Sequence, residues 1–186
     1  MKLAALPAVV TLAAFAAFTP AFAQSPGQAR TAHQDTEFLK AANQGSVDEI
    51  DMAKIALDKS TDPDVKAFAQ RMVTDHTQLL DDMKSFDAEA GLTIPEHSSV
   101  STLAEEAKLK LLTGDTFDKA YIKEMVAGHH KVLEAFIAEQ KSTGYPAFKD
   151  AVHSGADVVR QHLELANQTA KKLGLASAPV PVVPAA

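Results

Sequence analysis

The sequence contains no cysteine and no tryptophan. The lack of cysteine excludes disulfides and thiolate metal sites, so the fold must be stabilised by packing alone. Aromatic residues make up only 6% of the chain, and almost no segment has the pattern of a strand. Alanine, leucine, valine, methionine and phenylalanine must therefore fill the core, and their periodicity predicts an all-α protein.

The chain also lacks an excess of basic residues. It has 18 lysines and arginines against 24 aspartates and glutamates, which gives a formal net charge of −6. This balance argues against nucleic acid as a partner, and it leaves no basic patch for anionic lipid.

The usual signatures of catalysis are absent as well. The sequence has no cysteine nucleophile, no G-x-S-x-G elbow, no phosphate-binding loop and no H-E-x-x-H motif. These absences favour a non-enzymatic role, although they do not decide whether the protein is an enzyme.

The N-terminus has the pattern of a secretory signal peptide. Lys2 precedes an apolar run from Leu3 to Phe18, and the small-residue site Ala21-Phe22-Ala23 stands before Gln24. The apolar run is short for a bilayer span of about 20 residues, so cleavage is favoured over a transmembrane anchor. We expect residues 1–23 to be removed and the mature protein, without a transmembrane segment, to be periplasmic or secreted.

The remaining chain is predicted to form one helical domain with irregular ends. We expect residues 24–33 to be disordered, residues 34–174 to form the domain, and the Pro/Ala-rich residues 175–186 to form a disordered tail. Capping residues, prolines in first turns and closing glycines delimit the helices. They predict four long helices over about residues 35–59, 63–91, 115–144 and 146–174, with a short helix capped by Ser99 or Ser101 between the second and third.

Each long predicted helix carries a titratable side chain near its middle, within its apolar stripe. In the second helix one helical face consists of residues at spacings of three and four: Val65, Phe68, Met72, His76, Leu79, Met83 and Phe86. His76 lies on this face, and Asp75 can share it. The third and fourth helices place His129 and His162 in the same way. Burial of an unpaired polar group is costly. If these side chains lie at similar levels along the bundle axis, they are therefore expected to contact one another in one cluster.

The first long helix is harder to orient. Glu49 lies on a stripe with Phe38 and Met52, but Leu39 and other apolar residues mark a competing face. Gly45, in the middle of this helix, weakens it by about 1 kcal/mol relative to alanine, which suggests a close approach to a neighbouring helix.

The four polar residues are expected at similar levels along the bundle axis. With a rise of about 1.5 Å per residue, Glu49, His76, His129 and His162 fall within about two helical turns of one another. An up-down-up-down bundle places them nearly as close, so depth alone does not decide the topology. The long connection between the second and third helices can return along the bundle. We therefore predict an all-α, ferritin-like four-helix bundle with a long crossover that contains a short helix.

Residues 34–173 contain a series of short motifs in a defined order and spacing. They are Phe38, Gly45, Glu49-Ile50 and Ala53; Val65-Lys66-Ala67-Phe68-Ala69, Met72 and Asp75-His76-Thr77; Gly114-Asp115-Thr116-Phe117-Asp118 and Tyr121; His129 and Leu133; and His162-Leu163. In order and spacing they resemble a family of bacterial secreted domains of unknown function, labelled "predicted outer membrane protein" and described as ferritin-like four-helix bundles. The resemblance implies the fold and the compartment, and it implies no activity.

The chain departs from the ferritin pattern at the positions that would hold iron. Di-iron bundles use Glu-x-x-His on two helices, but Val73, Val126 and Val159 stand three residues before the mid-helix histidines. A bridged di-iron centre is therefore disfavoured. What remains is Glu49 and Asp75 with His76, His129 and His162, a mixed nitrogen and oxygen set that suits zinc, copper, nickel or mononuclear iron.

Two other features bear on this set. Methionines at positions 52, 72 and 125 lie one turn from the cluster, which would favour copper if their thioethers took part, but adaptable core filling is the favoured explanation. His130 should face outward, where Glu134 can reach it at the i+4 position.

Three interpretations stay open at this point. The first is a non-enzymatic binding or envelope-maintenance module, whose Glu/His cluster is a metal-free hydrogen-bonded network. The alternative is a bundle that binds copper, zinc or iron through the cluster. The third is a module for an envelope protein partner, with the two tails as tethers.

Overall fold

The computed structural model describes residues 26–185, and the predicted signal peptide with Gln24 lies outside the described residues. Within that range the chain forms four long helices and one short helix. Their bounds are α1 Pro26–Lys59, α2 Pro63–Ala90, α3 Val100–Lys110, α4 Gly114–Ser142 and α5 Pro146–Lys172.

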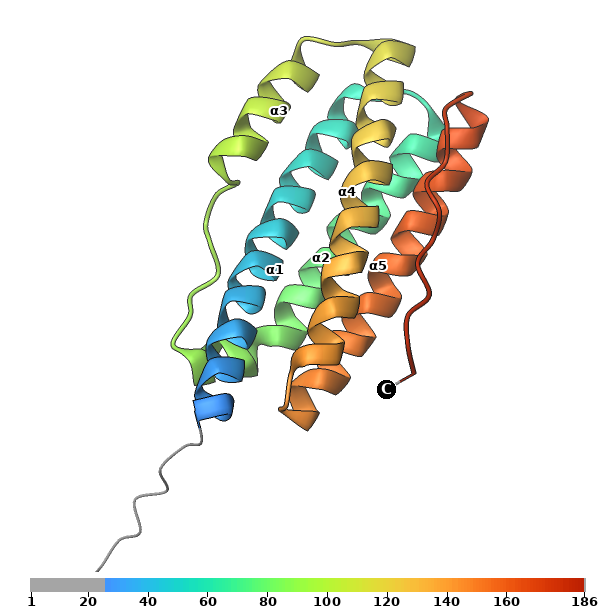
Figure 1. Cartoon of the computed structure of the whole chain (residues 1–186). Coiled ribbons are helices and arrows are strands. Elements are labelled where there is room, and N and C mark those ends of the chain that lie inside the picture. The colour runs from blue at the N-terminus through green and yellow to red at the C-terminus, as the bar shows by residue number, and fades with distance from the viewer. Residues whose placement is uncertain (1–25, 186) are drawn as a thin grey trace, which may run out of the picture.

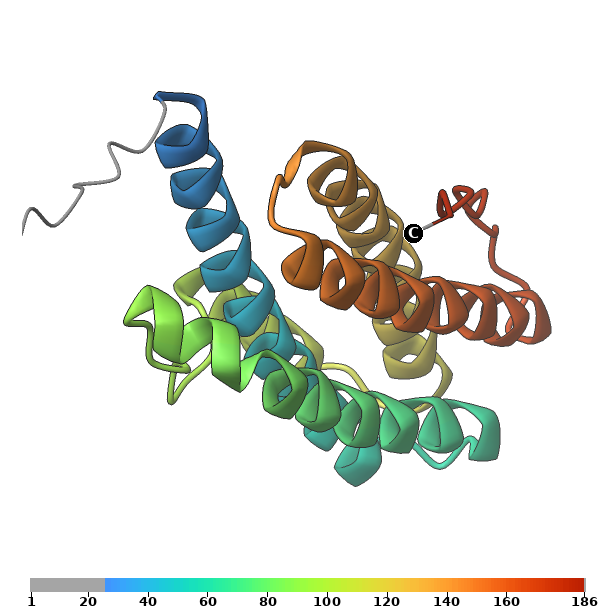
Figure 2. The same ribbon diagram turned by 90° about the horizontal axis from the view of Figure 1, so that it is seen from below.

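The topology contains the predicted crossover. Helices α1 and α2 form one antiparallel hairpin, and α4 and α5 form a second (Figure 1; Figure 2). Between the hairpins the chain returns along the outside of α1 through α3, so α2 and α4 run in the same direction (Figure 1). The prediction of an all-α bundle with a short helix in a long connection is therefore confirmed. No helix within residues 26–185 combines the length and the apolar character that a bilayer crossing requires.

Local signals explain where the helices of the first hairpin and the crossover begin and end. Asp62 caps α2 by accepting hydrogen bonds from the backbone of Asp64 and Val65, with Pro63 in the first turn. Gly91 closes α2 with φ of 66°, a left-handed conformation that glycine adopts without strain. Ser99, through a bond to the backbone of Thr102, is the residue that caps α3.

Helix α1 is longer than its capping signals predict. It begins at Pro26 instead of near Asp35. No proline or glycine lies between Gly27 and Gly45, so nothing in this stretch of sequence interrupts the helix.

The buried face of α1 combines residues of the predicted stripe, such as Met52, with residues outside it. Leu39, Asn43, Ser46 and Ala53 are buried, whereas Phe38 is only partly buried. Asn43 donates a hydrogen bond of 2.6 Å to the buried carboxylate of Asp87 on α2. Part of the buried face of α1 is therefore polar. Its polar side chains form hydrogen bonds to α2, and a search for apolar residues does not identify them.

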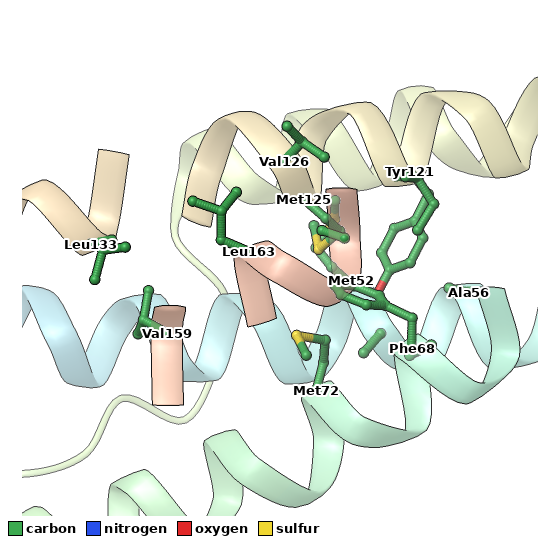
Figure 3. Packing of buried hydrophobic residues seen from close by; sticks show 14 of the residues in the cluster. Met52, Ala56, Phe68, Met72, Tyr121, Met125, Val126, Leu133, Val159 and Leu163 are labelled. Atoms are coloured by element: carbon green, nitrogen blue, oxygen red, sulfur yellow. The ribbon is translucent and has the colours of Figure 1, made fainter. Parts of the chain in front are cut away.

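Aromatic and methionine side chains fill the centre of the core. Phe117 and Tyr121 stack with ring centroids 6.2 Å apart, and Phe68 meets the ring of Tyr121 edge-on at 6.1 Å. Met52, Met72 and Met125 pack around these rings (Figure 3). Adaptable thioether side chains fit such irregular space between rings.

Two mid-helix glycines have opposite surroundings. A Cβ atom on Gly155 would lie 2.6 Å from Cε1 of Phe136, so the absence of a side chain lets α5 approach α4. A Cβ atom on Gly45 would meet nothing within 4 Å. The prediction that Gly45 permits a close helix approach is therefore wrong, and the residue borders an open space between α1 and α4.

Residues 175–185 form neither helix nor strand, and they run back along the α4–α5 hairpin (Figure 1). Asn167 pairs with Ala178 through two hydrogen bonds of 2.8 Å, one in each direction. Gln140 donates to the carbonyl of Pro184 at 3.1 Å, and Val180 and Val183 pack against the core. The tail thus covers apolar surface of the bundle.

Candidate metal centre

Three buried histidines meet in the middle of the bundle. His76 comes from α2, His129 from α4 and His162 from α5, and their exposed fractions are 5%, 2% and 1%. The ring centroids are separated by 5.2 Å, 5.4 Å and 6.0 Å. One ring nitrogen of each histidine lies within 4.8 Å of the corresponding nitrogens of the other two. Helices that are distant in sequence therefore supply three nitrogen donors to one small volume.

Each ring is held by a bond from one of its two nitrogens. The Nδ1 of His129 lies 2.9 Å from the carbonyl oxygen of Met125, and the Nε2 of His162 lies 2.9 Å from Oδ2 of Asp75. Carbonyl and carboxylate oxygens only accept, so these two nitrogens carry the protons. The Nδ1 of His76 lies 3.3 Å from the hydroxyl of Ser46.

The other nitrogen of each ring has no hydrogen-bond partner among the described residues. These atoms are Nε2 of His76, Nε2 of His129 and Nδ1 of His162, and all three are buried. Since His129 and His162 carry their protons on the bonded side, their free nitrogens are lone-pair donors. The residues present therefore fit a transition metal ion, which neutral imidazole nitrogens bind well.

Asp75 supports the group from outside. It bonds to His162 and also forms an ion pair with Arg71, one turn earlier on α2. Burial alone would raise the pKa of Asp75, but the hydrogen bonds from Arg71 and His162 outweigh burial and hold the pKa below its ordinary value. A charged Asp75 keeps the Nε2 proton of His162 in place and leaves Nδ1 as the lone-pair donor.

Glu49 also lies outside the group of three nitrogens. Its Oε1 is 3.9 Å from Nδ1 of His129, the nitrogen that already donates to Met125. Its Oε2 is buried and has no partner among the described residues. Burial raises the pKa of Glu49, and the nearby His129 acts in the opposite direction. The carboxylate therefore lies nearest to the bonded Nδ1 of His129 and is not part of the group of three nitrogens.

Burial also keeps two of the rings neutral. It lowers the pKa of His162 to about 4, an effect that His129 reinforces and the Asp75 carboxylate opposes. Burial lowers the pKa of His76 well below its ordinary value, with further lowering by His162 and His129. Neutral imidazoles are the form that binds metal, so protons compete little for these two ligands near pH 7.

Three other histidines lie away from this group. His130 points away from the core, 3.9 Å from Glu134 on the same helix, as the spacing predicted. His97 is exposed in the crossover. His153 contacts Gln140 near the turn that joins α4 to α5.

Sequence reasoning missed two residues of the centre. Ser46 was overlooked because the apolar pattern of α1 pointed to another face, although its position three residues before Glu49 was a usable signal. Arg71 stands four residues before Asp75, the spacing of a helical ion pair, and this pattern could have marked Asp75 as an anchored carboxylate.

Comparison with known proteins gives a family but no precedent for a role. Residues 20–169 match the family model described as "Domain of unknown function (DUF4142)". No curated protein matches the chain, and no solved structure matches it.

Proposed function

The chain belongs to the DUF4142 family of domains of unknown function, and from this premise we propose that it is a metal-binding helical bundle. In this proposal His76, His129 and His162 hold one transition metal ion. Its main support is the set of three buried ring nitrogens that lack a hydrogen-bond partner among the described residues. An unpaired buried polar group costs about 1–3 kcal/mol. Coordination of one ion would satisfy all three nitrogens together.

A metal-free polar network is the competing explanation of the cluster. Such a network would link the buried polar groups to one another. Instead, His129 and His162 bond outward, to a backbone carbonyl and to a carboxylate. Metal-bound imidazoles almost always donate their other N–H to such a partner, which fixes the tautomer and the ring orientation. The outward bonds therefore favour ligation over a closed network.

The donor set narrows the choice of ion. Imidazole nitrogens suit zinc, copper, nickel and iron, whereas carboxylate-rich sets suit harder ions. Three histidines without a carboxylate in the same group favour zinc or copper over iron. Three protein ligands would leave one position of a tetrahedral ion open, as in zinc sites that bind water or another small ligand. When bound, such an ion would supply Lewis acidity at that position.

Export of the protein belongs to the same proposal. Its support is the signal-peptide pattern of residues 1–23. N-terminal sequencing of protein isolated from the periplasm should begin at Gln24. Recovery of the protein only from the cytoplasm, with Met1 intact, would contradict it.

Titration of metal-free protein tests the metal site. Protein purified without a His tag and stripped with a chelator should bind one equivalent of Zn(II) or Cu(II). At a free ion concentration 100 times the Kd, the free energy of unfolding should rise by about 2.7 kcal/mol. No gain in stability with Zn(II), Cu(II), Cu(I) or Fe(II) would refute the proposal.

Matched variants locate the site. His129→Leu removes a donor and keeps the core filled, so it should abolish binding while the metal-free protein stays folded. His97→Ala alters an exposed histidine of the crossover and should bind the ion normally. Equal losses in both variants would place the ion elsewhere.

A further inference from the structure

An open cavity lies against the histidine group, between α1 and α4. It has a volume of about 140 Å³. Its wall is mainly apolar, with Phe38, Leu79 and Phe136 among the lining residues. His76, His129 and Glu49 line it as well. Val132 at the lining is 40% exposed while His129 is only 2% exposed, so the cavity connects the surface with the buried centre.

Small residues create this space. The α1 side of the cavity consists partly of Ala41, Ala42 and Gly45, and Ala135 faces it from α4. A Cβ atom on Gly45 would meet nothing within 4 Å. Glycine in a helix interior costs about 1 kcal/mol relative to alanine. The chain thus carries a destabilising residue at a position where a larger side chain would occupy the cavity.

The volume sets the size of an occupant. A cavity of about 150 Å³ lined by apolar side chains is known to hold one benzene molecule. The cavity beside Gly45 is of similar volume. It therefore fits a molecule of about one six-membered ring, and larger molecules would have to protrude past Val132.

The polar lining sets the chemistry of an occupant. Among residues 26–185, no lysine or arginine lines the cavity, and Glu49 is the only carboxylate that does. The Oε2 of Glu49 is buried and lacks a hydrogen-bond partner among the described residues. An unpaired buried acceptor of this kind favours a molecule that donates an O–H or N–H. Molecules with a negative charge are disfavoured, because they would face the carboxylate without a cation to balance it.

We propose that the cavity between α1 and α4 is a binding site for a small apolar molecule, of about one aromatic ring, that donates a hydrogen bond to Glu49. The inference does not require the metal ion, since the wall and the acceptor belong to the protein alone. It adds a second ligand to the proposed metal-binding bundle and places that ligand beside His76 and His129.

Two probes of similar size test the proposal on metal-free protein and again with one equivalent of Zn(II). Phenol carries a donor and toluene does not. Binding is measured by NMR titration or calorimetry. Phenol should bind the wild type saturably. In Glu49→Met the preference for phenol over toluene should fall about tenfold, the factor that one hydrogen bond can supply.

Substitutions at Gly45 supply the control. Gly45→Leu should fill the cavity and weaken binding of both probes at least about tenfold, while the affinity for the metal ion stays unchanged. Gly45→Ala also removes the helix-destabilising glycine, but its methyl group leaves most of the cavity empty, so this variant should retain probe binding. The proposal is overturned if neither probe saturates the wild type, if Gly45→Leu binds as well as the wild type, or if Glu49→Met keeps the phenol preference. Metal titration of the same samples reports separately on the histidine group.

Discussion

The Nε2 of His162 donates a 2.9 Å hydrogen bond to Oδ2 of Asp75, across the interface between α5 and α2. This bond joins the two helical hairpins at the level of the buried histidine group. It also determines which nitrogen of His162 is free to bind a metal ion. Asp75 is held in turn by Arg71 on its own helix. A surface ion pair thereby orients a buried ring.

Loss of the Asp75 carboxylate should weaken metal binding without removing a ligand. In Asp75→Ala the His162 ring loses the acceptor that fixes its tautomer, and we expect the affinity for Zn(II) to fall about 10–100-fold. Competition titration against a chromophoric chelator measures this change. Asp82→Ala, which alters an exposed carboxylate of the same helix, should leave the affinity unchanged. Full affinity in Asp75→Ala would show that the bond plays no part in ligation.

Helical spacing was sufficient to find the histidines. A polar residue with apolar neighbours three and four positions away on both sides is carried to the buried face of its helix, as His76, His129 and His162 show. Spacing says nothing about which ring nitrogen points inward. That depends on contacts made after folding, with the carbonyl of Met125 and with Asp75 from another helix.

The buried face of α1 could be predicted only in part, for a related reason. Its buried face contains Asn43 and Ser46, whose polar groups find partners on α2. A pattern based on apolar residues cannot register a polar residue that is satisfied across a helix seam. The same apolar pattern led to the prediction of Glu49 as a ligand; its Oε1 lies 3.9 Å from the bonded Nδ1 of His129, and the carboxylate lies outside the group of three nitrogens.

Stability should depend on pH through Glu139 at the C-terminal end of α4. Burial and the neighbouring Asp35 raise the pKa of Glu139 to about 7. The folded state therefore binds a proton more tightly than the unfolded state, whose glutamate titrates near its ordinary value of about 4.3. Between these values stability decreases as pH rises, and the loss is complete once pH passes the folded-state pKa.

The variant Glu139→Gln isolates this effect because glutamine resembles the protonated acid. It should raise the free energy of unfolding at pH 8, on the order of 1 kcal/mol, and change it little at pH 5. Urea denaturation at the two pH values measures the difference. Glu134→Gln, an exposed position on the same helix, serves as the control. An equal effect at pH 5 and pH 8 would contradict the assignment.

The C-terminal tail should contribute measurably to the stability of the bundle. Asn167→Ala removes both hydrogen bonds to Ala178, and we expect a loss of about 1–2 kcal/mol. Deletion of residues 177–186 should cost at least as much, because Val180 and Val183 then leave the core surface. Gln168→Ala, an exposed neighbour on α5, should be neutral. Unchanged unfolding free energies in both the substitution and the deletion would mean that the tail does not hold the bundle.

Alanine at Gly155 and alanine at Gly45 should have opposite effects. Gly155→Ala brings a methyl group to within 2.6 Å of the Phe136 ring, so the ring or the α4–α5 spacing must shift. Overpacking of this kind costs about 1–3 kcal/mol, which exceeds the gain of about 1 kcal/mol in helix propensity. Gly45→Ala meets no atom within 4 Å and should keep that gain. Thermal and urea unfolding of the two variants, compared with the wild type, give the sign of each change. Stabilisation by both substitutions would show that Phe136 yields at no cost, and destabilisation by both would show that α1 packs more closely at Gly45 than the cavity allows.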